Sequence, residues 1–334
     1  MSSFVKLGDL THIRTGKLDA NASSENGQYP FFTCSKEPLR IASYSYDCEC
    51  VLVAGNGDLN VKYYDGKFDA YQRTYIIESA DKRKLLVKYL YFFLDIYVEV
   101  LRTQSIGGVI KYIKLGNLTD AHIPLPSIER QAEIIECLEK CSTLIDKRQR
   151  QIALIEQTVK SRFIELFGDP ETNPKGWTRQ RLDQICENLD SRRVPITSTN
   201  RKAGNYPYYG ASGIVDYVKD YIFDEDILLI SEDGANLVMR STPIAFSVSG
   251  KVWVNNHAHV VRFESKATQK YIEICFALTD ISGSITGTAQ PKLNQAKLNA
   301  MMFCVPPIEL QEQFATFVEQ TDKSKLCGKM EVAA

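Results

Sequence analysis

The sequence lacks the features that place a chain in a membrane or in the secretory pathway. Its most apolar stretch, residues 85–101, is interrupted by Lys88, Asp95 and Glu99, so no run reaches the roughly 18 uncharged apolar residues that cross a bilayer. Residues 1–9 show no basic stretch, apolar core or small-residue cleavage site of a signal peptide. We therefore expect neither a membrane span nor export.

Excess charge of one sign and paired cysteines are also absent. The 40 basic and 41 acidic residues give a formal net charge of −1, so the overall balance does not indicate a nucleic-acid partner. The nine cysteines are an odd number and form no CxxC pair, which favours reduced thiols and a cytoplasmic protein. With 334 residues, 44% of them hydrophobic, the chain is long enough for about two folded domains.

Signatures of enzyme chemistry are missing too. There is no GxxxxGK[ST] phosphate loop, no GxGxxG loop, and no Asn-Pro-Pro-aromatic or Asp-Pro-Pro-aromatic motif of a DNA methyltransferase. The acidic group at residues 224–226 stands beside a turn, where solvated carboxylates are more common than a nuclease site. We expect no catalysis by this chain.

What the sequence does contain is one unit written twice. Four blocks recur in the same order: residues 29–32 with 206–209, 47–53 with 224–230 (closing on Gly57 and Gly234), 114–118 with 292–296, and 125–131 with 305–311. A duplication of this kind settles the architecture better than composition does. It predicts two equivalent domains.

Each half reads as a β-rich domain followed by a helix, which predicts the α+β class. Short β-branched and aromatic runs, such as residues 74–77 and 251–254, alternate with Gly, Asn and Asp turns. We expect one internal helix in each domain, near Lys82–Arg102 and near Thr268–Leu278.

The helix between the two domains is predicted to be unusually long. Residues 127–167 contain no Gly or Pro, and at about 1.5 Å per residue they would span about 60 Å, which suits a spacer. Apolar residues recur every seven positions and form a packing seam: Leu138, Ile145, Ile152, Val159 and Leu166. The second helix starts at Pro307 and is expected to reach only about Lys325, less than half as far.

Several segments together resemble the specificity subunit of type I restriction-modification systems. They are residues 55–75, the helix exit at 162–170 running into 173–177, and the two Pro-led helix starts. The resemblance covers nearly the whole chain. It implies a first target-recognition domain at residues 1–125, a spacer helix at 126–168, a linker and second recognition domain at 169–305, and a truncated second spacer helix with a tail at 306–334.

The family resemblance also implies partners. Each recognition domain would read one half of a split double-stranded DNA target, and the helices would carry methyltransferase subunits, to which a restriction subunit adds. The chain itself would hold no cofactor, since S-adenosylmethionine belongs to the methyltransferase. Because the second helix is short, a second chain or a second copy could complete the helical pair. The alternative is a protein-binding scaffold subunit that does not read DNA.

Candidate DNA-binding residues combine cations for phosphates with forked donors and acceptors for base edges. Without the resemblance, a solvated hairpin or turn would be the preferred interpretation. In the first domain they are Asn56, Asn60, Lys62, Tyr63, Lys67, Gln72, Arg73 and Lys111. In the second domain they are Asn236, Arg240, Asn255, Asn256, His257 and Lys292. We expect no metal site, because His257 and His259 have no further ligands at suitable spacing.

Overall fold

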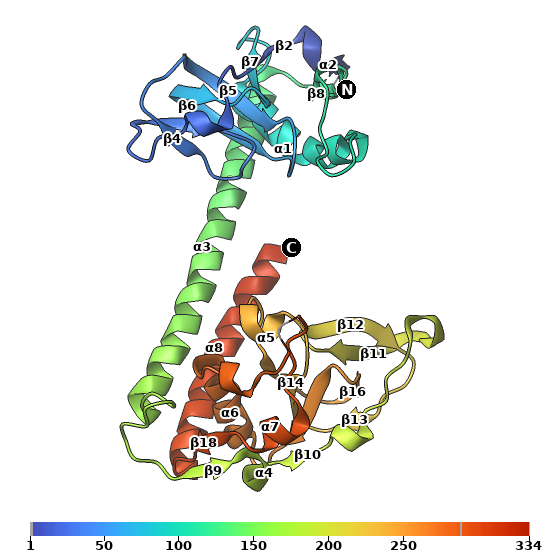
Figure 1. Ribbon diagram of the computed structural model, residues 1–334. Coiled ribbons are helices and arrows are strands. Elements are labelled where there is room, and N and C mark those ends of the chain that lie inside the picture. Colours follow the sequence, from blue (N-terminus) through green and yellow to red (C-terminus); the bar gives the residue numbers. More distant parts are fainter. Residues whose placement is uncertain (1–2, 288, 334) are drawn as a thin grey trace. The chain divides into compact units, whose positions relative to one another are not determined.

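The computed structural model describes the backbone of residues 3–287 and 289–333 and the side chains of residues 4–287 and 289–323 (Figure 1). The chain forms two compact units, and the boundary between Asp146 and Lys147 falls inside helix α3 (Ile128–Phe167). Among the described residues, no helix is both long and apolar enough to span a membrane.

The first unit is built on a six-stranded sheet in the order β2-β7-β5-β6-β3-β4, and β1 pairs with β8 beside it. Its elements before α3 are β1 (Ser3–Lys6), η1 (Leu7–Asp9), β2 (Thr11–Thr15), η2 (Ala20–Ala22), β3 (Tyr29–Phe32), β4 (Leu39–Ile41), β5 (Tyr46–Ala54), β6 (Val61–Ala70), β7 (Thr74–Ser79), α1 (Val87–Gln104), α2 (Leu115–Thr119) and β8 (His122–Leu125).

The second unit contains two four-stranded sheets, β10-β17-β14-β15 and β12-β11-β16-β13, and the pair β18-β9. Its elements after α3 are β9 (Arg179–Arg181), α4 (Leu182–Ile185), β10 (Glu187–Asn188), η3 (Asp190–Arg192), η4 (Ser198–Asn200), β11 (Ala203–Gly210), β12 (Gly213–Val218), β13 (Phe223–Asp224), β14 (Ile227–Ser231), α5 (Asn236–Met239), β15 (Ala245–Val248), β16 (Lys251–Val254), β17 (Ala258–Arg262), α6 (Lys266–Leu278), η5 (Ser282–Ser284), α7 (Gln295–Asn299), β18 (Met302–Cys304) and α8 (Ile308–Ala333).

The two units share one topology, which confirms the predicted duplication and the α+β class. In the first unit β5 pairs antiparallel with both β6 and β7, and β3 pairs parallel with β6. In the second unit β14 pairs antiparallel with both β15 and β17, and β11 pairs parallel with β16. Each unit then continues into a helix, a short helix, a last strand and a long helix.

The two units differ in the continuity of one hairpin. Strands β5 and β6 of the first unit stay paired without interruption from Tyr46–Phe68 to Val53–Val61. In the second unit each of the two equivalent strands is divided, the first into β13 and β14 and the second into β15 and β16, with Gly250 (φ +79°) between β15 and β16. Strand β13 pairs with β16 and β14 pairs with β15, and the two pairs belong to different sheets.

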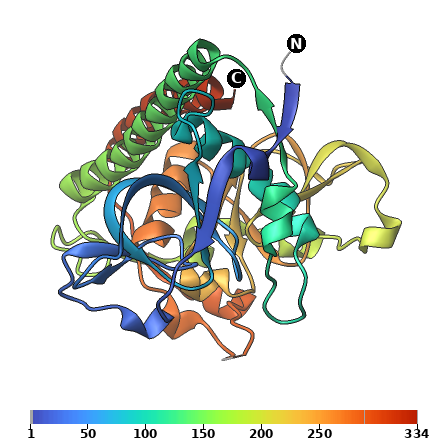
Figure 2. The same ribbon diagram turned by 90° about the horizontal axis from the view of Figure 1, so that it is seen from above.

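Each unit has its own apolar core between sheet and helix. In the first unit α1 packs Leu90, Leu94 and Leu101 against sheet residues that include Val51 and Ile77. In the second unit α6 packs against β14 and β17, and the core continues onto the C-terminal half of α3 and onto α8. The green C-terminal half of α3 and the red α8 therefore run side by side in both views (Figures 1 and 2).

The two long helices confirm one prediction and correct another. Helix α3 covers Ile128–Phe167, 40 residues, as expected. Helix α8 covers Ile308–Ala333, 26 residues, and passes through Gly328 instead of ending near Lys325. A single glycine costs a helix only about 1 kcal/mol and, unlike proline, removes no backbone donor, so it does not stop the helix. The prediction of less than half the length of the first helix was wrong.

Two smaller predictions also need correction. Helix α1 begins at Val87, not near Lys82, because residues 81–85 form a turn in which the Asp81 carboxylate accepts a hydrogen bond from the Arg83 backbone amide at 3.0 Å. In the second half of each repeat the two units correspond with an offset of 180 residues, since α7 and its N-cap Asn294 match α2 and its N-cap Lys114. Residues 114–118 therefore match 294–298, not 292–296.

Candidate nucleic-acid interface

Three loops of the first unit meet in what we call the first loop cluster, residues 55–58, 72–73 and 106–113. The Gly55 amide donates to the Arg73 carbonyl at 2.8 Å, and the Ile113 amide donates to the Gly55 carbonyl at 2.9 Å. The Gly57 amide donates to the Lys111 carbonyl at 2.9 Å. Backbone hydrogen bonds thus hold the loop after β5, the turn before β7 and the loop after α1 together.

The second unit repeats this scheme in the second loop cluster, residues 232–236, 255–257, 286–287 and 289–293. The Glu232 amide donates to the His257 carbonyl at 2.9 Å, and the Leu293 amide donates to the Glu232 carbonyl at 2.8 Å. The Gly234 amide donates to the Pro291 carbonyl at 3.1 Å. The backbone therefore places Arg73 and His257 at equivalent positions.

Four predicted DNA-binding residues of the first domain come together in the first loop cluster. Gln72, Arg73 and Lys111 are exposed, and among the described residues their side chains have no ion-pair or hydrogen-bond partner. Asn56 forms a β-bridge with Tyr112 and is half-buried. Gln72 and Arg73 line a hollow of about 260 Å³ together with Thr15, Gly55, Tyr75 and Ile113. These groups are available to an incoming ligand.

The other four predicted residues of the first domain lie on or next to β6 and are engaged within the unit. Asn60 donates to the Cys34 carbonyl at 2.8 Å, and Lys62 donates to Asn60 while burial lowers the pKa of its ammonium group. The Tyr63 hydroxyl donates to Glu49 at 2.9 Å, and the Lys67 ammonium group lies 4.7 Å from the centre of the Tyr44 ring.

The predicted residues of the second domain divide in the same way. His257 is half exposed, and its Nδ1 lies 2.9 Å from an Asp233 carboxylate oxygen. The exposed Lys292 ammonium group pairs with Glu232 at 3.1 Å. Asn256 is exposed, whereas Asn255 is buried and accepts a hydrogen bond from the His257 amide. All four residues belong to the second loop cluster.

Asn236 and Arg240 hold the chain around α5. The side-chain oxygen Oδ1 of Asn236 accepts hydrogen bonds from Ser241 Oγ and from the Thr242 amide, each at 3.0 Å. The Arg240 guanidinium group donates to the carbonyls of Phe276 and Thr279, each at 2.8 Å, at the end of α6. Arg240 itself has φ +48°, so its backbone is fixed in a conformation that is rare outside glycine. These contacts stabilise the fold.

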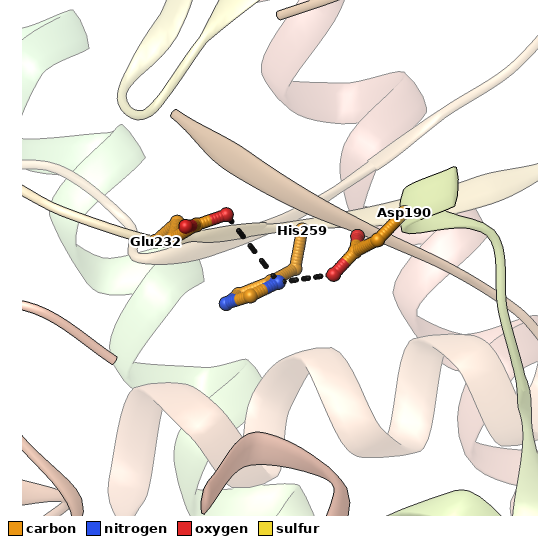
Figure 3. Close-up of side chains that lie close together, drawn as sticks. All are labelled: Asp190, Glu232 and His259. Atoms are coloured by element: carbon orange, nitrogen blue, oxygen red, sulfur yellow. Dashed lines mark hydrogen bonds and ion pairs between the residues drawn. The ribbon is translucent and has the colours of Figure 1, made fainter. Parts of the chain in front are cut away.

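A buried network of polar side chains adjoins the second loop cluster, and Figure 3 shows three of them, Asp190, Glu232 and His259. His259 on β17 places Nδ1 2.5 Å from Asp190 and 3.7 Å from Glu232, and its Nε2 lies 2.7 Å from the Leu293 carbonyl oxygen. Arg193 pairs with Glu232 at 2.6 Å and with Asp190 at 3.4 Å. The network joins η3, the end of β14, β17 and the last loop of the domain.

The two carboxylates of this network have lowered pKa values. The ring nitrogens of His259 lie against the Asp190 carboxylate and the Leu293 carbonyl oxygen. Burial by itself would raise the pKa of Asp190, but the hydrogen bond and charge of His259, with the amide of Val260 and the charge of Arg193, lower it below the usual value. Burial by itself would also raise the pKa of Glu232. The hydrogen bonds from Arg193 and Lys292 and the charges of His259 and Arg193 outweigh burial and lower this pKa below its usual value.

This charge balance bears on metal binding. The ligand atoms of Asp190, Glu232 and His259 lie within 4.8 Å of one another, which is compact enough for an ion. Arg193 and Lys292 pair with these carboxylates, and Nδ1 of His259 lies against Asp190. These contacts join the loops of the second cluster.

Two cations outside the clusters, Lys82 and Arg192, are paired on the surface. Lys82 binds Glu49 at 2.6 Å, and Arg192 binds Glu225 at 2.7 Å. In the acidic group at residues 224–226, Glu225 also binds Arg262 at 2.9 Å and Asp226 binds Lys266 at 2.8 Å. Paired carboxylates of this kind support the solvated interpretation over a nuclease site.

The seam residues of α3 differ in burial along the helix. Val159 is buried, Leu138, Ile152 and Leu166 are half-buried, and Ile145 is 38% exposed. The end of the seam packs with Phe163 and Phe167 against Phe314 and Val318 of α8. Leu144 and Leu154, in the middle of the helix, are 59% and 61% exposed.

Sequence reasoning missed some residues that build these clusters. Asp190 and Glu232 carry the charge network, and the apolar pair Val109–Ile110 stands exposed in the first cluster. Gln131, at the start of α3, is fully buried and bonds Leu86, Lys84 and Pro126. The recurrence of Gly107 as Gly287, 180 residues later, was the signal that could have marked the loop of Val109 and Ile110.

The fold of the chain is that of a known class of protein. It superimposes with a TM-score of 0.65 on the crystal structure of the S subunit of a type I restriction-modification system from M. genitalium, over 100% of this chain and 92% of that one, at 16% sequence identity. A family model described as the type I restriction modification DNA specificity domain matches residues 2–157 and 174–328.

Sequence relatives agree with the fold. The chain is 40% identical over 363 residues to the type I restriction enzyme EcoDI specificity subunit of Escherichia coli, covering 95% of this chain and 80% of the relative. It is 22% identical over 365 residues to the MjaVIII specificity subunit of Methanocaldococcus jannaschii, covering 95% and 85%. The chain therefore belongs to the specificity subunits of type I restriction-modification systems, which recognise a DNA target and are not catalytic.

Proposed function

We propose that each loop cluster reads one half of a split double-stranded DNA target. The observation that carries this proposal is the repeated backbone scheme: the same three loops are joined by the same hydrogen bonds in both units, while the side chains that they present differ. Equivalent frames with different side chains are what two readers of different half-sequences require. Under this proposal the recognition domains are residues 1–125 and 169–305.

The chemistry of the clusters supports DNA as the ligand. Arg73 and Lys111 offer cations that have no ion-pair partner among the described residues, and Gln72 offers an amide that can bond adenine in the major groove. In the second cluster His257, Asn256 and Lys292 offer the corresponding donors and acceptors. These side chains of both clusters are the base and phosphate contacts of the proposal.

We further propose that α3 is the docking helix for the methyltransferase subunits. Leu144 and Leu154 lie in its middle and are exposed, although leucine side chains of this kind favour burial. A helix from a methyltransferase subunit would cover them, and a restriction subunit would join the resulting complex. A second copy of this chain that completes the helical pair is the competing arrangement.

In this complex the methyltransferase would bind S-adenosylmethionine and flip an adenine out of the duplex to methylate it. The specificity chain would place the DNA and hold no cofactor. Such a complex would work in the cytoplasm, where the cysteine side chains stay reduced.

Co-expression with the methyltransferase subunit of the same system tests the proposal. We expect a purified complex that methylates adenines within one split motif, and a DNA affinity that falls steeply with salt. DNA affinity without sequence preference, together with a stable complex, would favour the scaffold alternative. The mass of the complex separates the arrangements of α3: one copy of this chain contradicts the second-copy arrangement, and two copies contradict the methyltransferase arrangement.

A further inference from the structure

The loop after α1 ends in two apolar side chains that nothing described in the first unit covers. The loop is closed at its base by Ile106 and Tyr112, which exchange backbone hydrogen bonds at 3.0 and 2.8 Å. At its tip Val109 is fully exposed and Ile110 is 62% exposed. Loop tips normally carry Gly, Asn, Asp, Pro or Ser, so a β-branched apolar pair there needs a reason.

The backbone conformation of the loop is fixed by a glycine turn and by the hydrogen bonds at its base. Gly107 turns the chain with φ +115°, and a Cβ at that position would lie 2.5 Å from the Ile110 carbonyl oxygen. The turn therefore requires glycine, and the two hydrogen bonds at the base hold the tip on a fixed stem. Val109 and Ile110 therefore lie at the tip of a hairpin with a defined backbone conformation.

The stem of this hairpin is part of the first loop cluster. Asn56 bridges to Tyr112, and the Lys111 carbonyl accepts the Gly57 amide. Ile113, one residue beyond the stem, lines the same hollow as Gln72 and Arg73. The tip of the hairpin therefore projects from the same cluster that carries these cationic and amide groups.

The second unit builds the same hairpin with different chemistry at its tip. Thr286 and Lys292 exchange backbone hydrogen bonds, each at 2.8 Å, and Gly287 has φ +80° with the same close approach to the Gln290 carbonyl oxygen. With the 180-residue offset, Val109 and Ile110 correspond to Ala289 and Gln290. Since the same turn forms in both units, the apolar pair is not needed to make it.

We propose that Val109 and Ile110 form an apolar wedge that enters a groove of the DNA and contacts the bases of the first half-site. Proteins that bend or read DNA place apolar side chains such as Ile, Leu, Phe or Met against bases in this way, beside cations that hold the phosphates. The wedge adds apolar contact to the polar readers Gln72 and Arg73. The inference rests on the proposed DNA-reading function of the cluster.

The test uses the full chain in complex with its methyltransferase subunits and a duplex that carries the methylated motif. The double variant V109A/I110A is expected to bind this duplex about tenfold more weakly, with an unchanged slope of affinity against salt, because no phosphate contact is lost. K111A is expected to reduce that slope by about 1. I96A, which alters an apolar side chain of α1 that is 76% exposed, is the matched control and is expected to change neither.

Each alternative has its own outcome. Wild-type affinity of V109A/I110A for the specific duplex would overturn the wedge while leaving the proposed function intact. Loss of the methyltransferase subunits from the V109A/I110A complex would show that the tip binds protein and would also overturn it. A wild-type complex that does not distinguish the duplex from unrelated DNA would refute the proposed function itself, and the wedge with it.

Discussion

The two loop clusters have the same backbone frame but differ in the contacts that stabilise them and in the side chains that they expose. In the second cluster the loops are joined by the side chains of Asp190, Arg193, Glu232 and His259. In the first cluster Gly55 stands where the second has Glu232, and the loops are joined by backbone hydrogen bonds around a hollow lined by Gln72 and Arg73. The comparison separates the frame, which is shared, from the side chains that can vary with the sequence being read.

Gly55 shows why the first cluster has no side chain equivalent to that of Glu232. A Cβ at residue 55 would lie 2.3 Å from the Arg73 carbonyl oxygen, so no larger side chain fits without moving the turn. In the second unit the same position carries Glu232, whose carboxylate reaches Arg193 and Lys292. Within the described part of the chain, the first cluster therefore leaves Arg73 and Lys111 without an ion pair, whereas the second pairs Arg193 and Lys292 with Glu232.

The largest expected effect comes from breaking the charge network. Asp190→Ala would leave the Arg193 charge and the buried His259 ring without their carboxylate partner in the interior, and we expect a loss of about 3–5 kcal/mol in the free energy of unfolding. Glu319→Ala removes an exposed ion pair with Lys323 and should cost at most about 1 kcal/mol. Chemical denaturation measures both. Equal small losses would show that the network does not support the second unit.

The same network predicts a response to acid that only the second unit shows. The pKa values of Asp190 and Glu232 are lowered in the folded state, so their contribution is complete above the unfolded values of about 4 and is lost as the pH falls through the folded values. We expect amides of β14 and β17 to lose protection from hydrogen exchange below about pH 4 before those of β5 and β7. Simultaneous loss in both units would contradict this.

A smaller effect compares two glutamines at equivalent helix starts. Gln131 makes three hydrogen bonds, to the Leu86 amide and to the carbonyls of Lys84 and Pro126. Gln311 donates to the Pro306 carbonyl, and its buried Oε1 has no partner among the described residues. At about 1 kcal/mol for each hydrogen bond, Gln131→Ala should cost about 3 kcal/mol and Gln311→Ala about 1 kcal/mol. The reverse order in denaturation experiments would show that the two anchors are not as described.

The smallest expected effect on stability is at Arg73. Its exposed side chain has no ion-pair or hydrogen-bond partner in the described part of the chain, so Arg73→Ala should change the free energy of unfolding by less than about 0.5 kcal/mol. A loss of DNA affinity without a change in thermal midpoint would mark Arg73 as a reader. A lowered thermal midpoint would instead give it a structural role.

Much of the fold could be predicted because the duplication places equivalent elements twice in the sequence, in the same order. The long helix α3 ended where Gly168 and Pro170 indicated, and the order of elements followed from the recurring blocks. The limits of local patterns showed at Gly328, which does not end α8, and at residues 114–118, where a Lys-Leu pair suggested a register that is two residues out. Backbone hydrogen bonding, not residue identity, fixes that register.

The candidate site could be predicted only in part. A loop rich in Lys, Gln and Arg indicated the first cluster, but sequence cannot tell which side chains are engaged within the protein. Arg240 and Asn236 have the chemistry of DNA readers, yet they bind carbonyls and a neighbouring turn. His259 and Asp190 are 69 residues apart in the sequence, and only the pairing of β10 and β17 brings their neighbourhoods together.

The central claim is that the two clusters are equivalent readers of two half-sites. The most direct test is to map methylated adenines in complexes that carry Arg73→Ala or His257→Ala, which alter equivalent positions of the two frames. We predict that each substitution relaxes one half of the split motif, a different half for each, and leaves the other half unchanged. Changes in both halves by either variant, or in neither by both, would contradict the account.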